Sequence, residues 1–452
     1  MIRYHARWVL PVTRPPIENG TVAVDGERIA YVGARAGAPT GEDRELGNVL
    51  LMPGLVNAHT HLELTAMRGF LEELEFDDWV ATLQRAKTAV LSPDDLLDAA
   101  RLGVLEGVLA GVTTFADTCD SGVSLRAMRE LGVRGIMYQE TFGPDPEACA
   151  GSLDALRVKV EILRQGETPL VRLGVSPHAP YTVSDALFGA VAAYARRDAL
   201  PLAIHIAESE AESRLVGRGD GPFAARLRQR GIATPPRARS PVALLARLGV
   251  LEAGPLLIHC VRVDGEDIAA IAAARCGVAH CPISNAKLGN GIAPLLPMLD
   301  AGIAVGLGSD SMASNDRMDL LEEARFASLA QRARRGRPDA LPAVLALELA
   351  TLGGARALGL TDRIGSLEPG KDADMVAFSL EDMRAVPVQD PATSAVFALG
   401  GSTASLVMVA GRVLIDRVSG RVPATGPGLA GRVARVGADL ATWRRTERTE
   451  PR

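Results

Sequence analysis

The spacing of apolar residues divides the chain into a long middle region and two shorter ends. From about residue 53 to residue 364, apolar runs of strand length alternate with amphipathic runs of helix length, which is typical of parallel βα units. Eight runs have the length and composition of strands, namely residues 50–59, 112–117, 134–140, 171–178, 201–208, 255–261, 277–284 and 303–310. They predict an α/β protein built on a (β/α)8 TIM barrel with insertions. An open doubly wound sheet is the alternative, but no Gly-rich dinucleotide motif follows the first strand.

Both ends of the chain carry short strand signals separated by turns. Asp25 and Gly26 lie between two alternating runs, and this pair is typical of a tight hairpin turn. Similar short runs return near the C-terminal end, in residues 365–380 and 405–422. The charged stretch beyond Ala424 predicts a terminal helix at a solvated edge. We therefore expect a small β-sandwich domain built from both termini, residues 1–52 and 365–452, around a barrel domain of residues 53–364.

Composition and charge exclude several classes of function. The chain has 452 residues, of which 47% are hydrophobic and 23% charged, with a net charge of −5. Such a protein offers no basic surface for phosphate backbones, so a nucleic-acid partner is not expected. No apolar stretch reaches the roughly 18 residues of a membrane span, and the first residues lack a signal-peptide pattern, so we expect a cytoplasmic protein with no membrane partner. The five cysteines form no CxxC pair, which indicates free thiols.

The histidines are concentrated at one predicted end of the barrel. Six of the seven lie at or just past the C-terminal ends of predicted strands, namely His59, His61, His178, His205, His259 and His280. Asp310 ends the eighth predicted strand. In a barrel these strand ends form one mouth, where catalytic groups lie. A single histidine near a strand is more often a core or surface residue than a ligand, but six at one rim favour a functional site.

Four of these residues suit one metal ion. His59 and His61 are two residues apart, and side chains at positions i and i+2 of a strand point to the same face. Both imidazoles can therefore turn into the barrel mouth. A third imidazole from His205 and a carboxylate from Asp310 would complete a set of three nitrogens and one oxygen, which suits zinc and leaves a position for water. Iron and manganese are the alternatives.

Six sequence motifs together resemble a known family. They are "PGLVNAHTH" (53–61), "HIAES" (205–209), "IHC" (258–260), "HCPISNAKLGNGIAP" (280–294), "GLGSDSMASND" (306–316) and "GSLEPGKDADMV" (365–376). In this order they resemble the amidohydrolase superfamily, in its branch of metal-dependent aminohydrolases and chlorohydrolases. The resemblance spans nearly the whole chain, and it implies the same barrel and β-sandwich that the hydrophobic pattern predicts.

The resemblance also implies roles for individual residues. One divalent metal, preferably zinc, would be held by His59, His61, His205 and Asp310. A second metal is not expected, because the end of the fourth strand, "SPHAPY", lacks the lysine of binuclear members. Glu208 would shuttle a proton from water to a ring nitrogen of the substrate, His259 would hydrogen-bond the oxygen at the reacting carbon, and Asp310 would pass a proton to the departing amine. Zinc would lower the pKa of its bound water to roughly 7.

The substrate expected from this resemblance is a purine nucleoside. "HLEL" (61–64) and "YQETFG" (138–143) resemble deaminases of 6-aminodeoxyfutalosine, an adenine nucleoside. The related deaminases of S-adenosylhomocysteine and methylthioadenosine usually carry an arginine, which holds the carboxylate of the amino acid, near the position of Gln139. The resemblance therefore favours 6-aminodeoxyfutalosine as substrate, ahead of methylthioadenosine, S-adenosylhomocysteine and adenosine. The residues expected to contact substrate are His178, His280, Glu63, Glu140 and Trp79, although both glutamates could be ordinary rim carboxylates. Phe70 and Trp79 either cover the base or pack the loop after the first strand.

Other functions remain open at the level of sequence. The same barrel chemistry could act on guanine, a triazine chloride or an imidazolone. An inactive barrel that binds or assembles with other proteins is a third class, and it predicts missing ligands, whereas all four are present. The sequence allows a homodimer, and it leaves Lys287 as either a phosphate or ribose contact or part of a loop ion pair.

Overall fold

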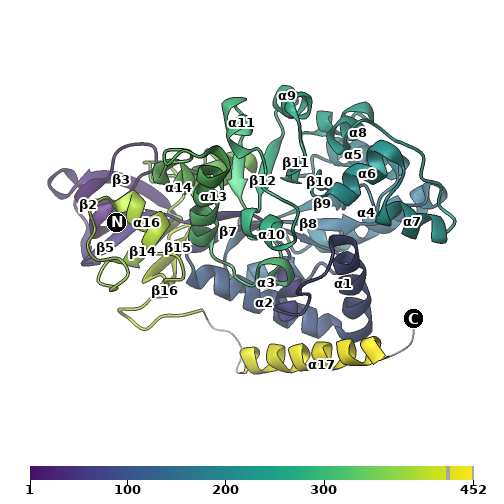
Figure 1. Ribbon diagram of the computed structural model, residues 1–452. Coiled ribbons are helices and arrows are strands. Elements are labelled where there is room, and N and C mark those ends of the chain that lie inside the picture. The colour runs from purple at the N-terminus through teal and green to yellow at the C-terminus, as the bar shows by residue number, and fades with distance from the viewer. Residues whose placement is uncertain (424–427, 450–452) are drawn as a thin grey trace.

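The chain folds into a sheet at one end and a larger body of parallel strands and helices at the other (Figure 1). The computed structural model describes residues 1–423 and 428–449. Within them the helices are α1 (Phe76–Val90), α2 (Pro93–Leu109), α3 (Val123–Leu131), α4 (Cys149–Arg164), α5 (Asp185–Arg197), α6 (Glu210–Arg218), α7 (Pro222–Gln229), α8 (Pro241–Arg247), α9 (Gly265–Ala273), α10 (Pro282–Lys287), α11 (Leu295–Asp300), α12 (Met312–Asn315), α13 (Leu320–Arg335), α14 (Ala343–Glu348), α15 (Gly354–Ala357), α16 (Pro391–Ala398) and α17 (Leu429–Thr449). None of the helices in these two ranges is long and apolar enough to cross a membrane.

The middle region contains eight parallel strands, as its hydrophobic pattern predicts. They are β6 (Leu55–Thr60), β7 (Val112–Cys119), β8 (Arg134–Thr141), β9 (Val171–Pro177), β10 (Ala203–Ile206), β11 (Leu256–His259), β12 (Gly277–His280) and β13 (Val305–Leu307). The first four pair in order as one parallel sheet, and the last four pair in order as a second. Isolated parallel bridges join Val175 to Leu202 and Thr60 to Asp310, and so link the two sheets at both pairs of edges. The prediction of an α/β fold with parallel strands is confirmed.

The prediction of one strand over residues 50–59 is wrong. The structure divides it into β5 (Val49–Pro53), which pairs with β1 and β14, and β6, which pairs with β7. Gly54 separates the two strands, and a side chain there would collide with Thr113, since a Cβ would lie 2.1 Å from its Oγ1 atom. The chain therefore changes from one sheet to the other at a position that needs glycine.

Both ends of the chain contribute to one eight-stranded sheet. Its strands are β1 (Ile2–Val9), β2 (Ile17–Asp25), β3 (Arg28–Ala34), β4 (Glu42–Glu45), β5, β14 (Met375–Ser379), β15 (Leu406–Val409) and β16 (Arg412–Asp416). The predicted hairpin is confirmed, because β2 and β3 pair antiparallel around Gly26, whose φ is +56°. Strand β5 carries the pairing from the N-terminal strands to β14, so the two ends of the sequence share this sheet.

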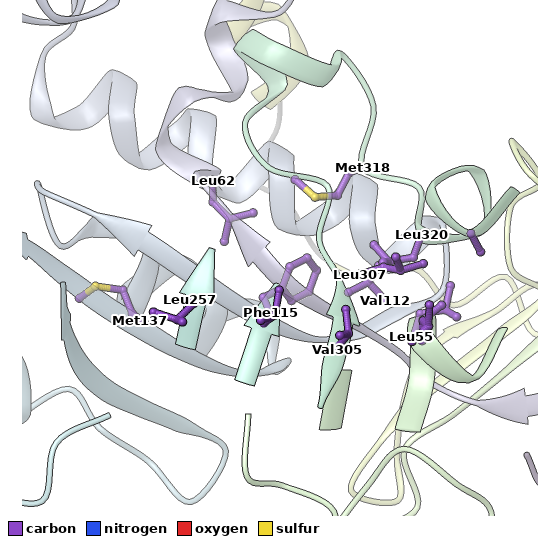
Figure 2. Close-up of a cluster of buried hydrophobic side chains, with 14 of the residues drawn as sticks. Leu55, Leu62, Val112, Phe115, Met137, Leu257, Val305, Leu307, Met318 and Leu320 are labelled. Carbon is purple, nitrogen blue, oxygen red and sulfur yellow. The ribbon is translucent and has the colours of Figure 1, made fainter. Parts of the chain in front are cut away.

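The main core lies between the parallel strands and the helices that cover them. Figure 2 shows Leu55, Phe115, Met137, Leu257 and Val305 from five different strands packed into this cluster, and all are buried. Apolar burial on this scale is the main stabilising contribution to a fold of this size. It also fixes the positions of the strand ends, where the polar side chains lie.

Helix α17 is not a solvated edge. The predicted helix is confirmed, but Leu429, Val433, Val436 and Leu440, which are three or four residues apart, are buried on one of its faces. They belong to a cluster with Met67 and other residues that follow the first parallel strand, and Figure 1 shows α17 running beneath α1 and α2. The terminal helix therefore supports the segment next to the two expected metal ligands.

Candidate metal centre and substrate cavity

Four side chains converge at the C-terminal ends of three parallel strands. His59 lies on β6 and His61 directly follows it, His205 lies on β10, and Asp310 follows β13. All four are at least 87% buried. Asp310 has a φ of +59°, which is uncommon outside glycine, and its backbone N–H donates to the carbonyl oxygen of His59. The fold thus holds the backbone of Asp310 in an uncommon conformation that directs its carboxylate toward the three histidines.

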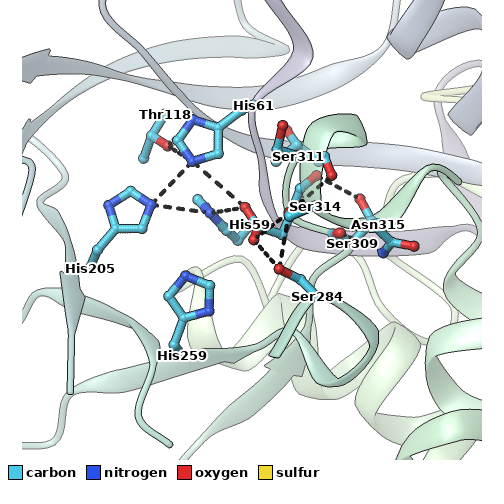
Figure 3. Close-up of polar contacts among 12 residues, drawn as sticks. His59, His61, Thr118, His205, His259, Ser284, Ser309, Ser311, Ser314 and Asn315 are labelled. Atoms are coloured by element: carbon cyan, nitrogen blue, oxygen red, sulfur yellow. Dashed lines mark hydrogen bonds and ion pairs between the residues drawn. The ribbon is translucent and has the colours of Figure 1, made fainter. Parts of the chain in front are cut away.

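The spacing of the four ligand atoms fits one tetrahedral metal ion. The Nε2 atom of His205 lies 3.2 Å from that of His61 and 3.3 Å from that of His59 (Figure 3). The Oδ1 atom of Asp310 lies 3.2 Å from His59 Nε2 and 3.7 Å from His61 Nε2. Zinc binds such atoms at about 2.0–2.1 Å, which places the ligands of a regular tetrahedron about 3.3–3.4 Å apart. The donor set and its spacing therefore fit zinc.

The ionisation of these groups suits metal binding. Burial, together with neighbouring histidines, holds the pKa values of His61 and His205 well below the usual range, so both rings are neutral at physiological pH. Burial alone would raise the pKa of Asp310, but its contact with His59 and the nearby histidines outweigh burial and lower it. Neutral imidazoles and an ionised carboxylate are the forms that bind a divalent cation.

One short segment, residues 284–290, positions the groups around this centre. Ser284 donates a hydrogen bond to Asp310 Oδ2, and Ser314 donates to the same oxygen at 3.0 Å. The side chain of Asn285 bonds His259 Nδ1 at 3.0 Å, and Asn290 lies 3.3 Å from Glu208 Oε1. Figure 3 shows Ser284 and Ser314 beside the histidine cluster. Three of the expected catalytic groups therefore depend on one segment for their orientation.

Glu208 is held at the start of α6 as a buried carboxyl group. It follows Ala207, whose φ is +52°, and Glu212 accepts hydrogen bonds from the backbone N–H groups of Ala207 and Glu208 at 2.9 and 2.8 Å. Burial, reinforced by the carboxyl groups of Asp310 and Glu212, raises the pKa of Glu208 well above its usual range. Its Oε1 atom lies 3.6 Å from His259 Nε2. Glu208 can therefore hold a proton beside the four convergent ligands.

A cavity of about 280 Å³ opens onto this centre. One wall is a single face of α1, because the α1 residues that line it recur every three or four positions: Phe76, Trp79, Val80, Leu83, Gln84, Lys87 and Thr88. The N-terminal part of this face is apolar and the C-terminal part is polar. The remaining lining residues are His61, Glu63, Leu64, Asp120, Glu140, Phe142, His178, Tyr181, His205, Glu208, His259, Leu288 and Asp310.

Four of the five expected substrate contacts reach this cavity. His178, Glu63, Glu140 and Trp79 line it, and Trp79 lies on α1 rather than in a loop. Thr182 Oγ1 bonds His178 Nδ1 at 2.8 Å, while His178 Nε2 lies 4.0 Å from Glu140. His280 is buried but is not among the cavity residues that the structure describes.

Two further residues from the sequence analysis lie outside the cavity. Phe70 packs against Trp443 of α17, with the ring centroids 6.3 Å apart, and so takes the loop-packing role rather than covering a base. Lys287 forms ion pairs with Glu72, at 2.6 Å, and with Asp316. The loop ion pair is therefore the alternative that the structure supports for Lys287.

The sequence analysis assigned no role to several residues that the structure brings to the site. Lys87 and Asp120 line the cavity, and Asp120 directly follows β7. The rule that selected the histidines, position at a strand end, would also have selected Asp120. The helical spacing of the α1 face was equally visible in the sequence. Ser284 and Asn285 gave no such signal, because their contacts cross from α10 to other elements.

Comparisons with known proteins agree with the site geometry. A family model described as the amidohydrolase family matches residues 50–414, and the chain belongs to this family. The chain is 33% identical, over 414 residues, to the 5-methylthioadenosine/S-adenosylhomocysteine deaminase of Moorella thermoacetica, covering 90% of this chain and 92% of that relative. The protein is therefore a hydrolase acting on carbon–nitrogen bonds of cyclic amidines, as predicted.

Two solved structures extend the similarity to the whole fold. An adenosine deaminase from Xanthomonas campestris with bound zinc superposes with a TM-score of 0.86 at 29% identity, covering 98% of each chain. Atrazine chlorohydrolase from Arthrobacter aurescens, complexed with zinc, gives a TM-score of 0.81 at 27% identity, covering 97% of this chain and all of that one. The resemblance to the amidohydrolase superfamily is confirmed, and a divalent metal is supported.

Proposed function

We propose that this protein is a zinc-dependent hydrolytic deaminase of adenine nucleosides. The observation that carries the proposal is the convergence of four ligand side chains, with four pairs of their ligand atoms 3.2–3.7 Å apart, beside a buried glutamate that lines a cavity. The names of the Moorella and Xanthomonas proteins, which are both deaminases of adenine nucleosides, support the substrate class. The candidate substrates are 6-aminodeoxyfutalosine, methylthioadenosine, S-adenosylhomocysteine and adenosine.

In this proposal His59, His61, His205 and Asp310 hold the metal. When bound, the metal supplies a water molecule of lowered pKa and polarises it for attack on the amine-bearing ring carbon. Zinc is favoured over iron or manganese because three imidazoles and one carboxylate at tetrahedral spacing are the arrangement zinc prefers.

The chain's own carboxyl groups move the protons. Glu208 takes a proton from the attacking water and delivers it to the neighbouring ring nitrogen, which makes the ring carbon more electrophilic. The segment that carries Asn290 holds Glu208 Oε1 in place for this transfer. Asp310 then accepts the hydroxyl proton and passes it to the departing amine, and its Oδ2 atom is held meanwhile by Ser284 and Ser314.

His259 and His178 orient the reacting ring. Because His259 Nδ1 donates to Asn285 Oδ1, the Nε2 atom of the neutral ring is left to accept a hydrogen bond from the hydroxyl group on the tetrahedral carbon. Burial lowers the pKa of His259 to about 4, so the ring is neutral at pH 7. His178 is fixed through Nδ1 by Thr182 and offers Nε2 to the purine or ribose, while Trp79 on the α1 wall packs against the base.

We also propose a domain arrangement for this enzyme. The two four-stranded parallel sheets form one (β/α)8 barrel of residues 53–364, and the Val175–Leu202 and Thr60–Asp310 bridges are the observations that support its closure. Residues 1–52 and 365–452 form the β-sandwich domain, a division supported by the sheet that strands from both ends share.

A substrate panel tests the function. Zinc-loaded protein is incubated with adenosine, S-adenosylhomocysteine, methylthioadenosine and 6-aminodeoxyfutalosine, and the change from adenine to hypoxanthine absorbance is followed. We expect turnover of at least one nucleoside, with one ammonia released for each ring converted. Absence of turnover on all four would contradict the nucleoside assignment.

A second candidate keeps the metal chemistry and changes the leaving group. The similarity to atrazine chlorohydrolase and the apolar part of the α1 wall favour a flat, uncharged heterocycle such as a triazine chloride. Chloride release from a triazine, or ammonia release from guanine, without activity on nucleosides would select this alternative.

A further inference from the structure

Polar groups on the cavity wall form a cluster around Lys87. Its Nζ atom donates to Glu63 Oε1 and to Asp120 Oδ1. Glu63 is buried and also accepts hydrogen bonds from Ser121 and, at 2.9 Å, from Cys119 Sγ. Asp120 is the more accessible carboxylate, with 34% of its side chain exposed, whereas Lys87 is 16% exposed. Two carboxylates therefore share the charge of one lysine on the cavity wall.

A wall with two carboxylates and one lysine is not suited to binding an anion. Lys87 is the sole Lys or Arg among the lining residues in the described part of the chain. Both carboxylates lie within ion-pair distance of Lys87 Nζ, and Glu63 is buried beside it. Lys87 is therefore already occupied by carboxylates within the protein.

Two buried polar atoms in the same cavity lack hydrogen-bond partners. They are Oε1 of Glu140 and Nε1 of Trp79, and both residues are more than 90% buried and line the cavity. Leaving a buried polar atom unpaired is unfavourable, so each of these atoms is expected to meet a partner from a ligand. A buried carboxyl oxygen and an indole N–H suit hydroxyl groups.

The position of the reaction centre indicates which part of a substrate meets this wall. The amine-bearing carbon of the base must lie beside His61, His205 and Asp310, which line the cavity. The sugar and its substituent then occupy the rest of the cavity, whose wall contains Lys87 on α1 and Asp120 just after β7.

We infer that this wall selects adenine nucleosides whose sugar carries a neutral or cationic substituent, and rejects those that carry a phosphate or a carboxylate. The inference rests on the proposed function and narrows it. An anionic substituent would face Asp120 while Lys87 remains bound to Glu63, and like charges that meet at a desolvated contact are strongly disfavoured. It ranks methylthioadenosine and adenosine ahead of the carboxylate-bearing S-adenosylhomocysteine and 6-aminodeoxyfutalosine.

The test compares probes that differ in charge. Zinc-loaded enzyme is assayed with methylthioadenosine, S-adenosylhomocysteine, adenosine 5′-monophosphate and 5′-amino-5′-deoxyadenosine. We expect kcat/KM for methylthioadenosine to exceed that for the monophosphate by about 100-fold, with S-adenosylhomocysteine in between. Equal kcat/KM for the neutral nucleoside and the monophosphate would overturn the inference.

An Asp120→Asn variant provides a test that loss of folding cannot imitate. In this variant, the ratio of kcat/KM for methylthioadenosine to kcat/KM for the monophosphate should fall by about tenfold. The kcat/KM for the cationic 5′-amino nucleoside should fall at the same time. The matched control is Asp154→Asn, which removes the same charge from a side chain that is 70% exposed on α4. An Asp120→Asn enzyme whose selectivity equals that of the control would also overturn the inference.

A binding measurement separates this inference from the proposed function. Calorimetric titration of zinc-loaded protein with inosine and with inosine 5′-monophosphate requires no deamination. If no nucleoside is turned over but inosine binds about 100-fold more tightly than its monophosphate, the deaminase proposal fails and the charge selection stands. Equal binding of the two, or binding of neither, overturns the charge selection whatever the activity.

Discussion

The proposed reaction centre and the α1 wall meet in one cavity but are built differently. At the reaction centre, His59, His205 and Asp310 come from parallel strands, and hydrogen bonds from Ser284 and Ser314 fix the carboxylate. On the α1 wall, a single helix face supplies apolar side chains, and the buried Nε1 atom of Trp79 remains unpaired.

This difference separates the groups that carry out the reaction from the groups that select the substrate. Groups that are already paired within the protein are pre-organised and need no substrate to order them, as proton transfer requires. Groups that lack partners within the protein gain them only when a substrate binds. The α1 face can therefore change without disturbing the metal ligands, and we expect changes on the two sides to produce different kinetic effects.

The largest effect should follow the loss of a metal ligand. In a His205→Ala variant, we expect kcat to fall by more than about 1,000-fold, because both metal affinity and water activation are lost. Metal content per chain, measured by mass spectrometry, should fall with it. The control is His5→Asn, which alters the histidine paired with Asp43 in the terminal sheet. Full metal content and activity in His205→Ala would contradict the ligand assignment.

The next largest effect should follow the removal of the proton carrier. A Glu208→Gln variant keeps the shape of the side chain but cannot shuttle a proton, so kcat should fall by about 100- to 10,000-fold while zinc remains bound. Glu210→Gln, two residues further along and 62% exposed, is the matched control. Activity in Glu208→Gln close to that of the control would show that this carboxyl group moves no proton.

A smaller effect is expected from the segment that positions these groups. Ser284→Ala removes one hydrogen bond to Asp310 and leaves that of Ser314, so zinc affinity or kcat should fall by about 10- to 100-fold. KM should stay within about twofold of the wild type, because Ser284 does not line the cavity among the residues described. A change in KM alone would place Ser284 on the substrate side instead.

The smallest effect should come from the α1 wall. Trp79→Ala removes packing against the base and should raise KM by about tenfold with little change in kcat, since this contact is made equally in the ground and transition states. Trp79→Phe keeps an aromatic ring and should recover most of the affinity. A fall in kcat with unchanged KM would break the division between the two sides of the cavity.

The sequence predicted the reaction centre better than the wall, for physical reasons. Parallel strands bring their C-terminal ends to one edge, so His59, His61, His205 and Asp310 could be grouped from strand positions alone. The same reasoning wrongly took residues 50–59 as one strand, because the apolar run continues through the switch at Gly54.

Contacts between distant elements were beyond this reasoning. The bonds of Lys87 to Glu63 and Asp120 join a helix to two different strand ends, and no periodic pattern in the sequence marks them. The same holds for Asn285 and His259, which are 26 residues apart in the chain. Pairings of this kind are set by how helices pack against the sheet, which only the folded structure reveals.

The most direct measurement is a zinc titration of metal-free protein during deamination of methylthioadenosine. We predict that the rate of the adenine-to-hypoxanthine absorbance change rises linearly with added zinc and reaches a plateau at one equivalent per chain, as a single site formed by His59, His61, His205 and Asp310 requires. Turnover by the metal-free protein, or a plateau only at two equivalents, would contradict the proposed mononuclear centre.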